Sequence, residues 1–118
     1  MKLVAFLGED KSTYGQITAL MNRMDCEQII ILKDKKTENP FNHEKCKSVE
    51  VDSSKDLISF KQEIQEKLKK VLSSDFEVAL TIASGNGKEH MALISALLSI
   101  PVGIKFAAFT KQGVEFLS

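Results

Sequence analysis

The sequence has few cysteines, no net charge and no long apolar run, and each of these absences excludes a class of protein. Cys26 and Cys46 stand alone without CxxC spacing, so we expect two buried or semi-buried free thiols in a reducing compartment. The 16 basic residues balance the 16 acidic ones, whereas a sequence-independent binder of long nucleic acid usually carries a basic excess. No apolar run reaches the ~20 residues that span a bilayer. The N-terminal MKLVAFLGEDK is too short and too soon charged for a secretory signal, so the sequence predicts a cytoplasmic protein.

Several chemical motifs are also missing. No cluster of His, Cys, Asp and Glu has the spacing of a metal site, so we expect no metal and no cofactor. The nucleophile elbow GxSxG is absent. The P-loop GxxxxGK[ST] and the dinucleotide fingerprint GxGxxG are absent as well.

Strand and helix patterns alternate along the 118 residues, which fits one domain over 1–118. Short apolar runs predict strands at 2–7, 28–33, 47–51, 76–82, 102–109 and 113–117. Helical spacing of apolar residues predicts helices over 13–24, after Ser53 and over 91–98. This order predicts an α/β fold with a mostly parallel sheet covered on both faces, and the last two strands form a terminal antiparallel hairpin.

Two helices carry further expectations. Ser53 is predicted to cap the second helix, with Asp56 at the capping-box position three residues on. The helix over 91–98 is apolar nearly all round, so we expect it to be buried, either in the core or at a subunit interface.

Two polar loops follow strands and lead into helices, as ligand-binding loops of open α/β sheets do. The first, after strand 2–7, contains Gly8, Glu9, Lys11 and Ser12. The second, after strand 76–82, is Ser84, Gly85, Asn86, Gly87 and Lys88. Glycine lets a backbone approach a phosphate closely, and a helix N-terminus attracts anions. Each loop is either a plain strand-to-helix turn or also an anion cradle, and the acidic Glu9 and Asp10 count against an anion at the first.

These two segments resemble a known family. The stretches 3-LVAFLGEDKSTYGQITALM-21 and 78-VALTIASGNGKEHMALISALL-98, with the hairpin 102-VGIKFAAFTKQGVEFL-117, look like a CARF domain, the CRISPR-associated Rossmann-fold sensor. The resemblance implies a Rossmann-like three-layer sandwich and a homodimer with a pocket across its two-fold axis. It implies that a cyclic oligoadenylate of type III CRISPR antiviral signalling binds there, with the protein as sensor or sink. By this resemblance the ligand-binding residues are Gly8, Glu9, Lys11, Ser12, Ser84, Gly85, Asn86, Gly87 and Lys88.

The chain departs from the family in two respects. CARF proteins usually carry a C-terminal effector, and none follows here, so we expect either a sensor domain cut from a longer protein or a stand-alone module. The first loop is also more acidic than the family pattern. Some CARF-like proteins cleave the ring without metal, and by that resemblance Ser12 and Lys88 would be catalytic. Two further interpretations stay open: a small α/β domain that binds a different nucleotide or a phosphorylated metabolite, and an interaction module without a ligand.

Overall fold

The structure, a computed structural model, describes residues 1–117. The strands are β1 (Lys2–Leu7), β2 (Ile29–Asp34), β3 (Cys46–Val51), β4 (Glu77–Thr81), β5 (Gly103–Thr110) and β6 (Gly113–Phe116). The α-helices are α1 (Tyr14–Arg23), α2 (Leu57–Val71) and α3 (Gly87–Leu98), and a short 3-10 helix, η1 (Lys11–Thr13), precedes α1. The order of strands and helices predicted from the sequence is confirmed.

One six-stranded sheet holds the molecule together, with the strand order β3-β2-β1-β4-β5-β6. The first five strands are parallel, and β6 pairs antiparallel with β5 as the end of the hairpin. In the centre Ala5 lies beside Ile31 on one side and Thr81 on the other. The predicted mostly parallel sheet with a C-terminal antiparallel hairpin is therefore confirmed.

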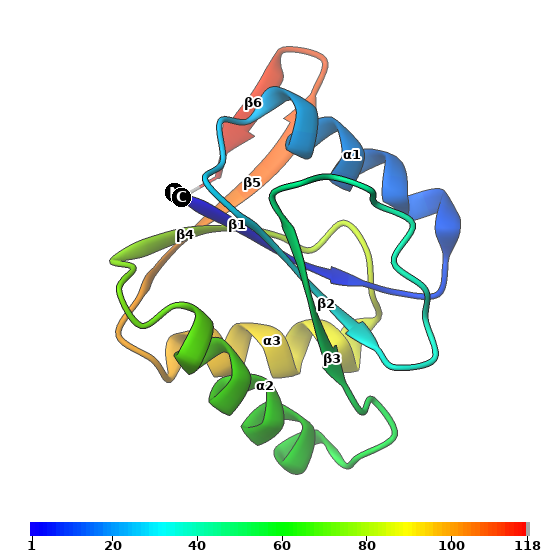
Figure 1. Cartoon of the computed structure of the whole chain (residues 1–118), viewed down its shortest axis with the longest axis vertical. Helices are drawn as coiled ribbons and strands as arrows, with labels where there is room; N and C mark the ends of the chain where they lie inside the picture. The colour runs from blue at the N-terminus through cyan, green and yellow to red at the C-terminus, as the bar shows by residue number, and fades with distance from the viewer. Residues whose placement is uncertain (118) are drawn as a thin grey trace.

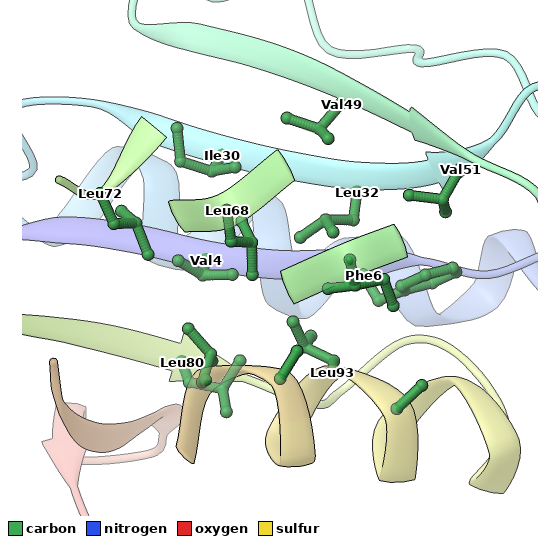
Figure 2. Packing of buried hydrophobic residues seen from close by; sticks show 14 of the residues in the cluster. Val4, Phe6, Ile30, Leu32, Val49, Val51, Leu68, Leu72, Leu80 and Leu93 are labelled. Atoms are coloured by element: carbon green, nitrogen blue, oxygen red, sulfur yellow. The ribbon is translucent and has the colours of Figure 1, made fainter. Parts of the chain in front are cut away.

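Helices cover both faces of this sheet, and Figure 1 shows α1 on one face and α2 with α3 on the other. Alternate residues of a strand point to opposite faces, so β1 contributes to two cores. Val4 and Phe6 belong to the cluster beneath α2 and α3, part of which Figure 2 shows. Leu3 and Leu7 belong to the cluster beneath α1. The chain is thus a Rossmann-like three-layer sandwich.

The predicted N-cap of α2 is wrong. Asp56, and not Ser53, caps the helix, since its carboxylate accepts a hydrogen bond from the N–H of Ser59 at 2.9 Å. Ser53 lies in the preceding turn, where its N–H and hydroxyl both donate to the carboxylate of Asp34. A residue at the end of β2 therefore binds the serine that the local pattern assigns to the helix.

The predicted burial of α3 holds on one face of the helix. Ala92, Leu93, Ala96 and Leu97 are fully buried against α2 and the sheet. Met91 and Leu98 instead leave 58% and 73% of their surface exposed, so an apolar strip of α3 lies uncovered. Over residues 1–117, no helix is both long enough and apolar enough to cross a membrane.

The two cysteines are free thiols, as the sequence predicts. Cys26 is buried and Cys46 is half-buried, and both contribute to the cluster beneath α1. Burial raises the pKa of each thiol above its usual value, because the charged thiolate is poorly solvated there. Neither thiol is therefore poised to react as a nucleophile.

Candidate functional site

The two predicted loops lie side by side, at the carboxyl ends of β1 and β4. These strands are neighbours in the sheet, although residues 8–76 lie between them in the chain. From β1 the chain crosses over α1 to β2 on one side, and from β3 it crosses over α2 to β4 on the other (Figure 1). Ligands of open α/β sheets bind at such a switch in direction. The strand order alone therefore brings both loops to the position where a ligand is expected.

Direct contact joins the two loops through their backbones. A Cβ atom on Gly8 would lie 2.7 Å from the nitrogen and 2.8 Å from the Cα of Gly85, closer than real Cβ atoms come. The N–H of Gly8 donates to the hydroxyl oxygen of Ser84 at 2.9 Å, and Ser84 is only 1% exposed. Glycine at position 8 is thus required by the close approach of its neighbour, and Ser84 links the two turns.

A short chain of hydroxyls extends this link to the start of α1. The Thr13 hydroxyl lies 2.7 Å from the Ser84 oxygen and 2.6 Å from the carbonyl oxygen of Asp10. One hydroxyl carries one proton, so the proton of Ser84 can complete the pair of bonds. The Tyr14 hydroxyl donates to the carbonyl of Gly8 at 2.6 Å. Both turns and the first turn of α1 therefore form one hydrogen-bonded unit.

The second turn ends in a capped helix that still offers backbone donors. Asn86 is the N-cap of α3, and its side chain and that of Glu89 form a reciprocal capping box. Gly85 has φ +103°, a conformation that favours glycine. Among residues 1–117, the N–H groups of Gly87 and Lys88 have no hydrogen-bond acceptor. These two donors at a helix N-terminus can hold an anionic oxygen.

His90 supports the same turn from inside α3. Its Nε2 lies 2.7 Å from the carbonyl oxygen of Ser84, and because a carbonyl can only accept, this nitrogen carries the proton. The imidazole also lies against Gly85, where it would be 3.1 Å from an added Cβ. The half-buried His90 therefore positions the turn, as a partly buried histidine often does.

Charges around the paired turns are mixed. Burial raises the pKa of the Glu89 carboxyl, and the negative charge of Glu9 raises it further. The Asp10 carboxylate accepts bonds from the hydroxyl and N–H of Ser12, which lower its pKa. Within residues 1–117, Lys11 is exposed and makes no ion pair or hydrogen bond through its ammonium, which is free to meet an anion. An anion bound at the paired turns would therefore interact with backbone N–H groups and with the positive charge of Lys11.

Ser12 and Lys88, the two predicted catalytic residues, are engaged with different neighbours. The Ser12 hydroxyl donates to the Asp10 carboxylate at 2.7 Å. The Lys88 ammonium donates to the carbonyl oxygens of Ser53 and Lys55, and it lies 5.7 Å from the centre of the Phe60 ring. Lys88 thus ties the start of α3 to the turn before α2 instead of extending over Gly85. Their catalytic roles stay predictions.

The turn that holds Lys88 depends on Asp34. This carboxylate accepts bonds from the hydroxyl and N–H of Ser53 and from the N–H of Lys36, and they lower its pKa from 3.8 to about 2. The folded state therefore favours the charged form. The resulting stabilisation is complete above the unfolded pKa of 3.8 and is lost as the pH falls from there to about 2.

Asp34→Asn is expected to lower the free energy of unfolding by about 1–2 kcal/mol at pH 7, because the turn loses a charged acceptor. The difference between variant and wild type should shrink as the pH falls below 3.8. Urea denaturation at pH 7 and pH 3 measures both values, with the exposed Asp25→Asn as control. A difference that is equal at the two pH values would contradict the role given to this carboxylate.

Sequence reasoning misses Thr13 as a site residue. It places the residue at the start of the helix predicted over 13–24, where a threonine is a helix-cap candidate. Nothing local shows that its hydroxyl meets Ser84, 71 residues away. The remaining predicted ligand-binding residues lie on the two joined turns, and the ammonium of Lys88 points to the turn before α2.

Comparison with protein-family models matches none of them to this chain, and comparison with curated proteins gives no match either. A proposal on function therefore rests on the resemblance of the two loop segments to a CARF domain and on the geometry of the paired turns.

Proposed function

We propose that the protein binds a cyclic oligoadenylate at the paired turns, as a sensor or sink in type III CRISPR antiviral signalling. The observation that carries this proposal is the direct contact between the turns, in which Gly8 meets Gly85 and Ser84 at the switch point of the sheet. The unpaired N–H groups of Gly87 and Lys88 would bind a phosphate oxygen of the ring. Lys11 would add a positive charge. The free thiols support a reducing, cytoplasmic setting.

A homodimer is part of this proposal. A symmetric ring suits a pocket on a two-fold axis, where each subunit supplies equivalent turns. Met91 and Leu98 on the uncovered strip of α3 offer apolar surface for the contact. Because α3 begins at the Gly85 turn, a contact along this helix keeps the turns of both subunits near the axis.

Leu98→Asp is expected to convert the dimer to a monomer, because the contact would then bury an unpaired carboxylate. Sedimentation equilibrium measures the change as a halving of the mass. Phe76→Asp serves as the control, since Phe76 is 93% exposed and lies next to the amino end of β4, away from the turns. A wild-type protein that is monomeric at all concentrations, or a Leu98→Asp variant that remains dimeric, would contradict this interface.

Cleavage of the ring without metal is the alternative function. The ribose 2′-OH would attack the adjacent phosphorus, the 5′ oxygen would leave, and the 2′ proton would pass to it, giving a linear product with a 2′,3′-cyclic phosphate. Ser12 would position the scissile phosphate and Lys88 would stabilise the charge on it. For this, the Lys88 ammonium must leave the carbonyls of Ser53 and Lys55. The observed contacts thus favour binding over cleavage.

If the ring is cleaved, Lys88→Ala is expected to slow cleavage about 100-fold, the usual effect of removing one group that stabilises transition-state charge. Single-turnover cleavage of labelled ring measures the rate. Lys55→Ala is the matched control, because its backbone carbonyl still accepts from Lys88 while its own ammonium is removed. An unchanged rate in Lys88→Ala would exclude it from catalysis.

Incubation with labelled cyclic tetra-adenylate and hexa-adenylate, without metal, tests the proposal. Native and denaturing gels separate the outcomes. A retarded band that contains intact ring supports a sensor or sink, and linear products support a ring nuclease. If the gels show neither a retarded band nor linear products, the ligand of the paired turns is a different nucleotide or a phosphorylated metabolite.

A further inference from the structure

A hollow of about 230 Å³ opens close to the paired turns, between the carboxyl end of β4 and the middle of β5. β4 leaves the sheet after Thr81, whereas β5 continues to Thr110. The space that β4 vacates is bounded by Ile82, Ala83, Ala107 and Ala108. The hollow is therefore a product of the sheet topology.

Its walls are mainly apolar. Ile82 and Leu117 both line it, and they leave 38% and 66% of their surface exposed. Three alanines also belong to the lining and leave room in front of the backbone. A ligand with an apolar face that covers these two side chains would remove their surface from water, which is favourable.

Gln16 supplies a polar group at the rim. Its amide nitrogen donates to the carbonyl of Phe109 at 2.9 Å, and its oxygen accepts from the N–H of Phe109 at 3.1 Å. The amide is thus held against β5 as a neighbouring strand would be. A glutamine amide has two N–H donors and two acceptor lone pairs, so one of each remains for a ligand.

The hollow lies next to the Gly85 turn along the chain. Residues 82–85 link them directly, and three extended residue steps span at most about 10 Å. Thr13 contacts Ser84 while Gln16 lines the hollow, and residues three apart lie on one face of a helix. The same side of α1 therefore borders both places.

We infer that this hollow is the seat of an adenine base whose phosphate lies at the Gly85 turn. The flat apolar ring packs against Ile82, Leu117 and the alanines, and the Gln16 amide hydrogen-bonds to the edge of the ring. This inference rests on the proposed nucleotide ligand and adds to it the residues that recognise the base.

Nuclear magnetic resonance of the ¹⁵N-labelled protein tests the base seat without the ring. Adenosine at millimolar concentration carries the base but no phosphate, and ribose 5-phosphate carries the phosphate but no base. We expect adenosine to shift the amides of Ala83, Ala107 and Ala108 and the side-chain NH₂ of Gln16. Ribose 5-phosphate should instead shift Gly85, Gly87 and Lys88.

Ala83→Phe fills the hollow from an exposed position, whereas Ser74→Phe adds the same side chain at an exposed position near the amino end of β4, outside the hollow. Ala83→Phe should weaken adenosine binding at least ~10-fold, and Ser74→Phe should match wild type. Adenosine that shifts none of the hollow residues, or that binds Ala83→Phe as tightly as wild type, would overturn the base seat.

The same experiments distinguish failure of the cyclic oligoadenylate proposal from failure of the base seat. If cyclic oligoadenylates do not bind but adenosine shifts the resonances of the hollow residues, the base seat stands and the proposed ring ligand is wrong. If a ring binds while the hollow residues do not shift, the ring proposal stands and the base seat is wrong.

Discussion

Gly8→Ala is expected to lower the free energy of unfolding by about 1–3 kcal/mol and to abolish ring binding. The added Cβ would lie 2.7 Å from the nitrogen of Gly85 and 2.8 Å from its Cα. Both atoms are backbone, so no side chain can rotate away, and the two turns must separate. Overpacking of a closely packed contact costs energy of this order. Urea denaturation and ring binding by titration calorimetry measure the two effects.

Gly87→Ala is the matched control for this change. A Cβ at Gly87 would meet nothing within 4 Å, and the residue has no positive φ. Because Gly87 is itself one of the proposed phosphate-binding residues, this variant is a control for stability alone. Replacing this helical glycine with alanine should raise the free energy of unfolding by about 0.4–1 kcal/mol, because the unfolded chain loses conformational freedom. If Gly8→Ala and Gly87→Ala had the same free energy of unfolding, the two turns would not be in tight contact.

Ser84→Ala should lower the free energy of unfolding by about 2 kcal/mol, the second largest effect. Ser84 is 1% exposed, and its oxygen accepts from the N–H of Gly8 and lies 2.7 Å from the Thr13 hydroxyl. Alanine leaves the buried N–H of Gly8 without a partner, and an unsatisfied buried donor costs about 1–3 kcal/mol. Ring binding should also become weaker in this variant, because Ser84 joins the two turns. Urea denaturation measures the loss.

An exposed serine provides the comparison. Ser54→Ala removes only a bond to the Asp52 carboxylate at the surface, so it should change stability by less than about 0.5 kcal/mol. A Ser84→Ala variant as stable as Ser54→Ala would contradict the linking role of Ser84.

Sequence patterns suffice for the strands and helices, because most of them bury apolar residues at a regular period. The run QIIILK predicts β2, and its isoleucines are fully buried. The stripe that predicts α2 consists of Leu57, Phe60, Ile64, Leu68 and Val71. Its three central residues are fully buried, whereas Val71 is half-buried and Leu57 is 39% exposed. Burial of apolar side chains stabilises both elements, and the spacing of apolar residues along the sequence predicts which side chains are buried.

The cap of α2 could not be predicted in the same way. Ser53 and Asp56 both fit local capping patterns, and the choice between them depends on Asp34 from a distant strand. A contact over 19 residues that is set by the tertiary fold leaves no local pattern.

For the site, both loops are predicted from their glycines and polar residues, but their contact is not. It depends on β4 entering the sheet beside β1, which the order of elements along the chain does not specify. The direction of the Lys88 side chain could not be predicted either. Its partners are backbone carbonyls, and because every residue has one, the sequence does not mark them. Gln16 is missed for a similar reason, because it pairs with the backbone of Phe109.

Titration calorimetry of the purified protein with cyclic tetra-adenylate and cyclic hexa-adenylate is the most direct test of the paired turns as a ligand site. We predict saturable binding of one of them, with one ring bound per two chains. The absence of saturable binding for both rings, under conditions in which the protein is folded and dimeric, would contradict the proposed function.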